Sequence, residues 1–174
     1  MSLTEYELDV AFAREVSSST EFYIWLLKQT KFASVADSAI LLDQEQALAK
    51  PKKKPENWWR HWWCRLDDDS ESETDIFLVF GLPGSDKRIA LHIEDKPPHG
   101  KFTPNQYINY NRRAEFMMNK LQYMNYQEFA TILLAPACFI NENQDQVSHF
   151  DCLILYESVA HRIPEFAQSL REAS

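Results

Sequence analysis

Glycine is scarce in this chain, with three residues among 174. Loops that bind nucleotide phosphates depend on closely spaced glycines, because only a residue without a side chain lets the backbone approach the phosphates. The three glycines form no such cluster, and the chain has no internal repeat. The sequence therefore excludes nucleotide-binding folds of the glycine-rich-loop type.

Cysteines and long apolar runs are scarce as well. Cys64, Cys138 and Cys152 show no Cys-x-x-Cys spacing, and the last two lie in apolar runs, so we expect reduced core residues. No basic and apolar leader follows Met1, and no apolar run approaches the roughly 18 residues that span a bilayer. These absences predict a cytoplasmic protein that is neither secreted nor inserted into a membrane.

Positive charge is in deficit, since the formal net charge is -8. Lysines and arginines supply most of the non-specific affinity of proteins for nucleic acids, so this balance argues against a general polyanion binder. Part of the excess is local, because five acids lie between residues 67 and 73, where a loop can hold them away from a site. Lys50 and Lys52 to Lys54 form either a basic patch or a solvated loop.

The length fits one domain, which we expect to span residues 1–174. The residue patterns predict strands interspersed with helices, and hence an α/β (α+β) fold with a central mixed β-sheet and helices on both faces. We expect helices over 3–16, from 18 through 27, over 103–121 and over 164–173, a loop over 33–57, and strands over 62–66, 74–80, 89–96, 131–140 and 150–156.

The strands 74–80 and 89–96 flank a turn and are expected to form a hairpin. A two-residue type II′ turn centred between Gly84 and Ser85 pairs residues whose numbers sum to 169, so Asp75 falls opposite Glu94. Directly opposed residues point to the same face with Cβ atoms about 5 Å apart. Because side chains alternate along a strand, Lys96 shares this face while Asp95 points away.

This cluster of Asp75, Glu94 and Lys96 predicts a cation site. Two opposed carboxylates repel each other, and a divalent cation between them relieves the repulsion because hard cations prefer carboxylate oxygens. A neighbouring lysine can stabilise phosphate charge or orient water. The alternative for each residue is a solvated charge at a strand end, and the shared register favours the site.

Asp75, followed by Glu94-x-Lys96 on the next strand and then by a helix near Gln106, resembles the PD-(D/E)XK nuclease superfamily, the restriction-endonuclease-like fold. The stretch 93–98, with 102–106 after it, is similar to a bacterial branch of that superfamily. The resemblance extends from the first helix to about residue 156. Thr74 stands where the proline of the superfamily's name would be, which removes no ligand.

The resemblance implies roles for several residues. Asp75 and Glu94 would bind Mg²⁺ or Mn²⁺, the backbone carbonyl of Asp95 would add a ligand, and Lys96 would assist the attacking water. An acid on the first helix would complete the site, with Glu5 favoured over Asp9 and Glu15 and a solvated helix face as the alternative for each. Gln106 either points at the site or caps its own helix after Thr103.

Other residues carry weaker indications of nucleic-acid contact. Tyr110 and Arg113 on the helix after residue 103, and Lys52 and Lys53 in the basic run, are candidates for backbone contacts, with ordinary surface positions as the alternative. Trp58, Trp59, Trp62 and Trp63 either stack on bases or pack in a core or interface. His92 lies on the face of Glu94, either near the metal or as a core histidine.

The sequence therefore favours a metal-dependent nuclease that hydrolyses phosphodiester bonds, with nucleic acid, preferably DNA, as its partner. A homodimer and a monomer both stay open. The alternative is a catalytically inactive module with the same fold that binds nucleic acid or a protein. The net negative charge favours this module, whereas the two opposed acids favour the enzyme, because a module without turnover has no physical reason to keep them.

Overall fold

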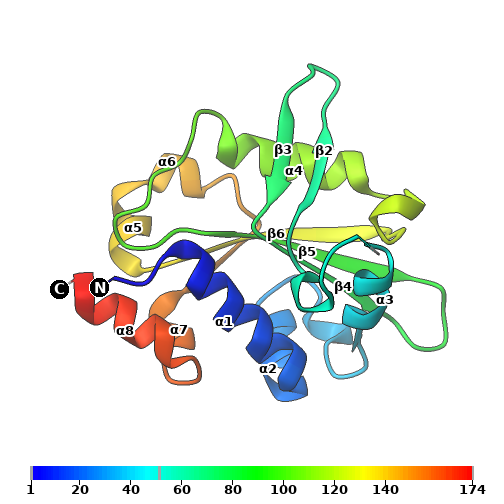
Figure 1. Ribbon diagram of the computed structural model, residues 1–174, viewed down its shortest axis with the longest axis horizontal. Helices are drawn as coiled ribbons and strands as arrows, with labels where there is room; N and C mark the ends of the chain where they lie inside the picture. The colour runs from blue at the N-terminus through cyan, green and yellow to red at the C-terminus, as the bar shows by residue number, and fades with distance from the viewer. Residues whose placement is uncertain (1, 51, 174) are drawn as a thin grey trace.

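A five-stranded mixed β-sheet forms the centre of the computed structural model, which describes residues 2–50 and 52–173 (Figure 1). The strand order is β1-β4-β5-β6-β7, with antiparallel pairing from β1 to β5 and parallel pairing from β5 to β7. A second sheet pairs β2 with β3. The strands are β1 (Ile40–Leu41), β2 (Trp62–Arg65), β3 (Glu71–Thr74), β4 (Ile76–Gly81), β5 (Arg88–Asp95), β6 (Glu128–Ala135) and β7 (Cys152–Leu155).

Helices connect these strands and cover both faces of the central sheet. The α-helices are α1 (Glu5–Ser18), α2 (Thr20–Lys28), α3 (Asp43–Leu48), α4 (Gln106–Met117), α5 (Ala137–Glu142), α6 (Gln144–Val147), α7 (Tyr156–Val159) and α8 (Pro164–Ala173). Three short 3₁₀ helices are η1 (Ala33–Val35), η2 (Pro55–Asn57) and η3 (Leu121–Tyr123). This architecture confirms the expected α/β class with a mixed central sheet and helices on both faces.

Side chains of the central strands point alternately to the two faces of the sheet, so each face packs in a separate apolar layer. The face that carries Ile76, Leu78, Leu91 and Ile93 packs on α1, α2, α7 and α8 in one continuous core. The opposite face, which carries Phe77, packs on α4, α5 and the β2–β3 hairpin. Central strands buried on both faces are apolar at nearly every position, which explains why β4 and β5 lack simple polar alternation.

The pairing of β4 with β5 has the predicted register. Ile76 pairs with Ile93 and Gly81 with Arg88, so partner numbers sum to 169. The predicted two-residue type II′ turn is wrong. The Leu82 N–H bonds the Lys87 carbonyl, which leaves a four-residue loop, and within it the Ser85 N–H bonds the Leu82 carbonyl. Gly84 has φ +81° at the third position of that turn, where a positive φ favours glycine. The register is unaffected because this loop has the same centre.

The long N-terminal loop and one predicted strand differ from expectation. Residues 33–57 contain β1 and α3, which pair with or pack against β4 and were not predicted because each is too short to show a period. β6 ends at Ala135, and Pro136 precedes α5, so Cys138 is exposed on a helix and not in the core as expected. Cys64 is buried and Cys152 half-buried.

The helix starts follow their sequence patterns with small shifts. Ser19 caps α2, one residue beyond the start predicted at Ser18, and its Oγ accepts a hydrogen bond from the Phe22 N–H. The α4 helix begins at Gln106 after Asn105, which has a left-handed backbone, and ends at Met117. The closing helix α8 has the predicted bounds.

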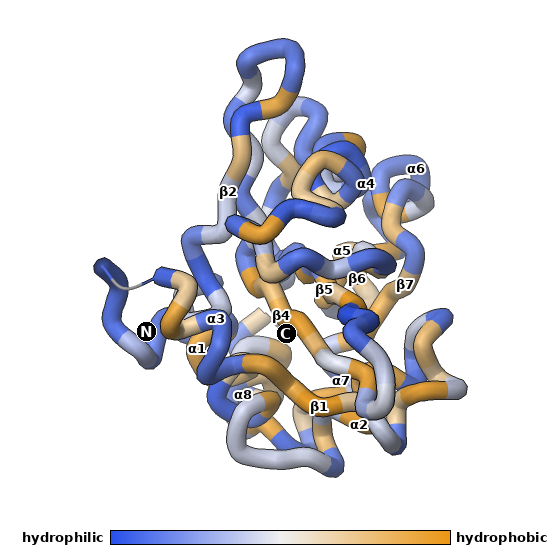
Figure 2. The backbone as a smooth tube through the Cα atoms, turned by 90° about the vertical axis from the view of Figure 1, so that its right-hand side faces the viewer, coloured by the Kyte–Doolittle hydropathy of each residue, from blue (hydrophilic) through white to orange (hydrophobic). Residues whose placement is uncertain are grey.

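The acidic run lies on the β2–β3 hairpin, which projects away from the central sheet (Figure 1) and is mostly hydrophilic at its tip (Figure 2). Asp68 at this tip bonds Ser70 and pairs with Arg112 of α4. The expectation that a loop holds these acids away from the centre is met for the tip but is wrong for Glu71 and Glu73, which lie in β3, and Glu73 lines a pocket beside Asp75. Within the described residues, no helix has both the length and the apolar character needed to cross a bilayer.

Candidate active site

The ends of β4 and β5 bring the predicted triad together. Asp75 directly precedes β4, while Glu94 and Lys96 lie at the end of β5 and just beyond it. The Asp75 carboxyl lies close enough to Glu94 for the Glu94 charge to raise its pKa, and its Oδ2 accepts the Asp95 N–H at 3.0 Å. Lys96 Nζ contacts Glu94 Oε1. Glu94 is fully buried and Lys96 is nearly so.

Gln106 joins this triad from the start of α4. Its Nε2 donates to Glu94 Oε1 at 2.5 Å, while its Oε1 accepts the Thr103 N–H at 3.0 Å. One rotamer therefore points at the site and holds the segment before the helix, because the amide has a donor at one end and an acceptor at the other. The predicted helix cap at Thr103 is wrong, because Asn105 is the N-cap of α4 and no side chain caps this helix.

The first helix contributes Glu5 and Asp9, which lie one turn apart on α1. Glu5 Oε2 lies 3.9 Å from Lys96 Nζ. Asp9 is buried, and burial together with the nearby Asp95 charge raises the pKa of its carboxyl well above the usual value. Both acids therefore approach the centre, and in the described part of the chain no contact connects Glu15 with these groups.

Asp95 points to the opposite sheet face from Glu94, as the alternation predicts. Its Oδ1 accepts a hydrogen bond from the Tyr156 hydroxyl at the start of α7, and its buried Oδ2 has no hydrogen-bond partner among the described residues. The backbone N–H of the same residue holds Asp75. The backbone of Asp95 thus contacts Asp75 on one sheet face, and its side chain lies near Asp9 on the other face.

Burial and mutual repulsion dominate the electrostatics of the site. Burial raises the pKa of Asp75 well above its usual value, and the Glu94 carboxylate raises it further. Burial and the Asp95 charge do the same to the pKa of Asp9. Burial lowers the pKa of Lys96, but the Glu94 and Glu5 charges outweigh burial and raise the pKa above its usual value, so Lys96 stays cationic.

The donor set fits a hard divalent cation. The site gathers five acids and a single lysine, and the buried Oε2 of Glu94 has no hydrogen-bond partner among the described residues. In residues 2–50 and 52–173, no three His, Cys, Asp or Glu side chains are gathered tightly enough to form a complete ligand group. Magnesium usually keeps several waters and takes one or two carboxylates from the protein, which suits Asp75 and Glu94.

Two predicted nucleic-acid contacts are buried, which contradicts a surface role. Tyr110 is 1% exposed, its hydroxyl donates to the Ile93 carbonyl, and it accepts the Asp75 N–H at 3.1 Å. Arg113 is equally buried and donates to Ser72 Oγ and the Glu73 carbonyl. Tyr110 thus braces the backbone on either side of the site, and Arg113 fixes β3 on α4.

The remaining candidates lie outside the triad. Lys52 and Lys53 are exposed before η2. Trp58, Trp59 and Trp62 are buried, and Trp63 is 52% exposed, so three of the four pack in the core. His92 is a core histidine whose Nε2 contacts the Tyr126 hydroxyl at 3.0 Å.

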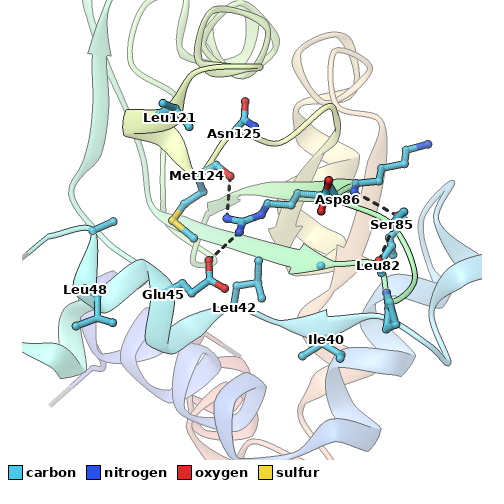
Figure 3. Close-up of a pocket in the computed structure, with 15 residues that line it drawn as sticks. Ile40, Leu42, Glu45, Leu48, Leu82, Ser85, Asp86, Leu121, Met124 and Asn125 are labelled. Carbon is cyan, nitrogen blue, oxygen red and sulfur yellow. Dashed lines mark hydrogen bonds and ion pairs between the residues drawn. The ribbon is translucent and has the colours of Figure 1, made fainter.

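A small pocket of about 190 Å³ opens beside Asp75 and is lined by Glu5, Tyr6, Asp9, Trp59, Arg60, Glu73, Thr74 and Asp75. A larger pocket of about 770 Å³ lies by the turn of the β4–β5 hairpin, between α3 and the segment 121–125 (Figure 3). Its arginine, Arg88, is engaged by the Met124 carbonyl and Glu45. None of the predicted site residues lines the larger pocket.

The Tyr156 hydroxyl, the Asp95 carboxyl and Arg60 are site groups that sequence reasoning missed. Asp95 was assigned a backbone role, and its place on the other face was predicted, but its partner Tyr156 lies 61 residues away. No local pattern signals such a contact. Arg60 lies between Trp59 and Trp62 in the sequence, and a single arginine among tryptophans forms no motif that indicates a site.

Comparisons with protein-family models, with curated proteins and with solved structures find no match to this chain.

Proposed function

We propose that this protein is a metal-dependent nuclease that hydrolyses phosphodiester bonds of nucleic acid, with DNA as the favoured substrate and a restriction-endonuclease-like core. One observation carries the proposal. The β4–β5 register brings Asp75 to Glu94, and Lys96 Nζ contacts Glu94 and approaches Glu5. The sequence resemblance supports the same set of residues.

Each residue of the site has a role in this proposal. Asp75 and Glu94 would hold Mg²⁺ or Mn²⁺, with the Asp95 carbonyl as a further ligand and Glu5 at the open side. A bound metal would supply Lewis-acid chemistry and a nucleophilic water. Lys96 stabilises negative charge that develops on the phosphate, and it remains protonated because its carboxylate neighbours raise its pKa. Gln106 holds Glu94 in place.

The three cysteines form no disulfide, which agrees with a reducing compartment and with our proposal that the protein acts in the cytoplasm.

Cleavage of plasmid and single-stranded DNA in Mg²⁺ or Mn²⁺ tests this function. We expect Glu94→Gln to abolish cleavage and Lys96→Met to lower kcat about 100-fold or more. Glu128 at the start of β6 and Lys87 just before β5 form an exposed acid–lysine pair at 2.5 Å, so Glu128→Gln and Lys87→Met are matched controls that should keep activity. Equal cleavage by all variants would reveal a contaminating nuclease.

Metal binding provides a second, independent measurement. We expect Mn²⁺ at 100 times its Kd to add about 2.7 kcal/mol to the free energy of unfolding of the wild type and so to raise its Tm. The Tm of Glu94→Gln should not change when Mn²⁺ is added. A crystal soaked in Mn²⁺ that shows no ion between Asp75 and Glu94 would disprove the ligand assignment.

An inactive binding module is the second candidate. The observation that favours it is the internal pairing of Glu94 Oε1 with Lys96 and Gln106, which gives the acid a structural role without a metal. Binding of DNA without cleavage in either metal would select this candidate.

A further inference from the structure

Arg60 is the only cation among the residues that line the pocket beside Asp75. It comes from the segment between η2 and β2, while α1 forms the facing wall through Glu5 and Tyr6. Lys96 is already engaged by Glu94. An anionic substrate that enters this acidic pocket therefore meets one cation that no carboxylate holds.

The Arg60 guanidinium lies against aromatic rings. Its Cζ is 4.4 Å from the Tyr6 ring centroid and 5.6 Å from that of Trp59, and these two rings stack at 6.4 Å. Among the described residues, no hydrogen bond or ion pair engages its N–H donors. Stacking leaves the edge of a guanidinium free, and that edge matches the geometry of a phosphate.

The backbone around Arg60 is fixed relative to the triad. The Trp59 carbonyl accepts the Phe77 N–H at 2.9 Å, two residues after Asp75. Lys50 Nζ donates to the Arg60 carbonyl at 3.2 Å and to that of His61, whose φ is +61°. This bracing reduces the conformational entropy that Arg60 would lose on binding a ligand.

We propose that Arg60 binds a substrate phosphate next to Asp75 and is the residue that makes this acidic pocket accept a polyanion. This inference rests on the proposed nuclease function and names a substrate-binding residue within it. The chain carries a net charge of -8, so general attraction does not supply affinity, and a local contact is required. Tyr6, 46% exposed, extends the surface on which an adjacent base can stack.

Anisotropy titrations of a labelled single-stranded oligonucleotide, with Ca²⁺ in place of Mg²⁺ to prevent cleavage, test the inference across a range of salt concentrations. We expect Arg60→Ala to raise Kd at least about tenfold. The negative slope of log K against log salt should become less steep by about 0.7, the value for one lost phosphate contact on a single strand. Arg60→Lys should keep the slope and bind more weakly, because it keeps the charge without the planar fork.

Arg65→Ala is the matched control, since this arginine lies on β2, is exposed and pairs with Glu71 at 3.1 Å. It should leave both Kd and the salt slope unchanged. Thermal unfolding of all variants shows whether each is folded, and the Lys variant provides the test if Arg60→Ala does not fold. If Arg60→Ala and Arg60→Lys both bind the oligonucleotide as tightly as the wild type does, this inference is wrong and the proposed function is unaffected. A wild type that neither binds nor cleaves DNA would overturn the proposed function as well.

Discussion

The side-chain amide of Gln106 donates to Glu94 Oε1 over 2.5 Å and so connects the start of α4 with the end of β5. The other end of this amide accepts the Thr103 N–H. A buried carboxylate needs hydrogen-bond partners, and Lys96 and Gln106 both donate to Oε1 of Glu94. The orientation of Glu94 therefore depends on an amide that distinguishes donor from acceptor.

We expect Gln106→Glu to destabilise the metal-free protein more than Gln106→Ala at pH 7. The alanine loses a helix-start contact and a hydrogen bond to a buried charged group, which costs about 1–3 kcal/mol. The glutamate can still accept the Thr103 N–H, but it places a second carboxylate against Glu94. Urea denaturation at pH 7 and pH 5 measures both effects, and the Glu variant should regain stability at pH 5.

Gln168 provides the control for this comparison. Its Nε2 donates to Glu172 Oε1 at 2.8 Å on the exposed side of α8, so Gln168→Glu creates the same pair of acids in solvent. Like charges four residues apart on a helix surface cost only about 0.2–0.5 kcal/mol. If Gln106→Glu were no more costly than this control, Glu94 would not depend on the donor at position 106.

Local patterns predicted the geometry within one hairpin. The register depends only on the centre of the turn, so Asp75 and Glu94 meet although the turn itself is of another type. Alternation along β5 likewise placed Asp95 on the far face. The capping pattern placed the start of α4 at Thr103, three residues early, because Asn105 is the N-cap and no side chain caps it.

Contacts between distant segments were not predictable. The two-residue strand β1 and the six-residue helix α3 are too short to show periodicity and form because they pack on β4. The helical pattern predicted Arg113 as a surface residue. In the structure the β2–β3 hairpin, a separate sheet, covers it. The partner of Asp95 depends on where α7 begins, which β7 determines.

Tyr156→Phe removes a hydroxyl that donates to the buried Oδ1 of Asp95. Because the other oxygen of this carboxyl has no hydrogen-bond partner among the described residues, we expect a loss of about 1–3 kcal/mol in the free energy of unfolding. Chemical denaturation with an unchanged m value measures the loss. Tyr23→Phe is the control, since its hydroxyl donates to the neutral Ala39 carbonyl at 3.2 Å and should cost less. Equal losses would show that Asp95 does not rely on Tyr156.

Asp9→Asn should stabilise the metal-free protein at neutral pH. Burial, followed by the charge of Asp95, raises the folded-state pKa of Asp9 well above 3.8, so the folded protein binds a proton that the unfolded chain releases. The stability that this proton contributes is complete below pH 3.8 and is lost as pH rises through the folded pKa. Asparagine cannot ionise, so its neutral amide does not repel the Asp95 carboxylate at any pH.

The difference between Asp9→Asn and the wild type should therefore be small near pH 4 and grow with pH. Its slope should approach about 1.4 kcal/mol per pH unit, the value for one proton, within the window between the two pKa values. Denaturation curves from pH 4 to pH 8 in a chelating buffer measure this slope. Asp37→Asn, at an exposed side chain paired with Lys28, should stay within about 0.5 kcal/mol of the wild type throughout. A difference that shrinks as pH rises would mean that Asp9 is held as a carboxylate, and the repulsion inferred for Asp9 and Asp95 would then be absent.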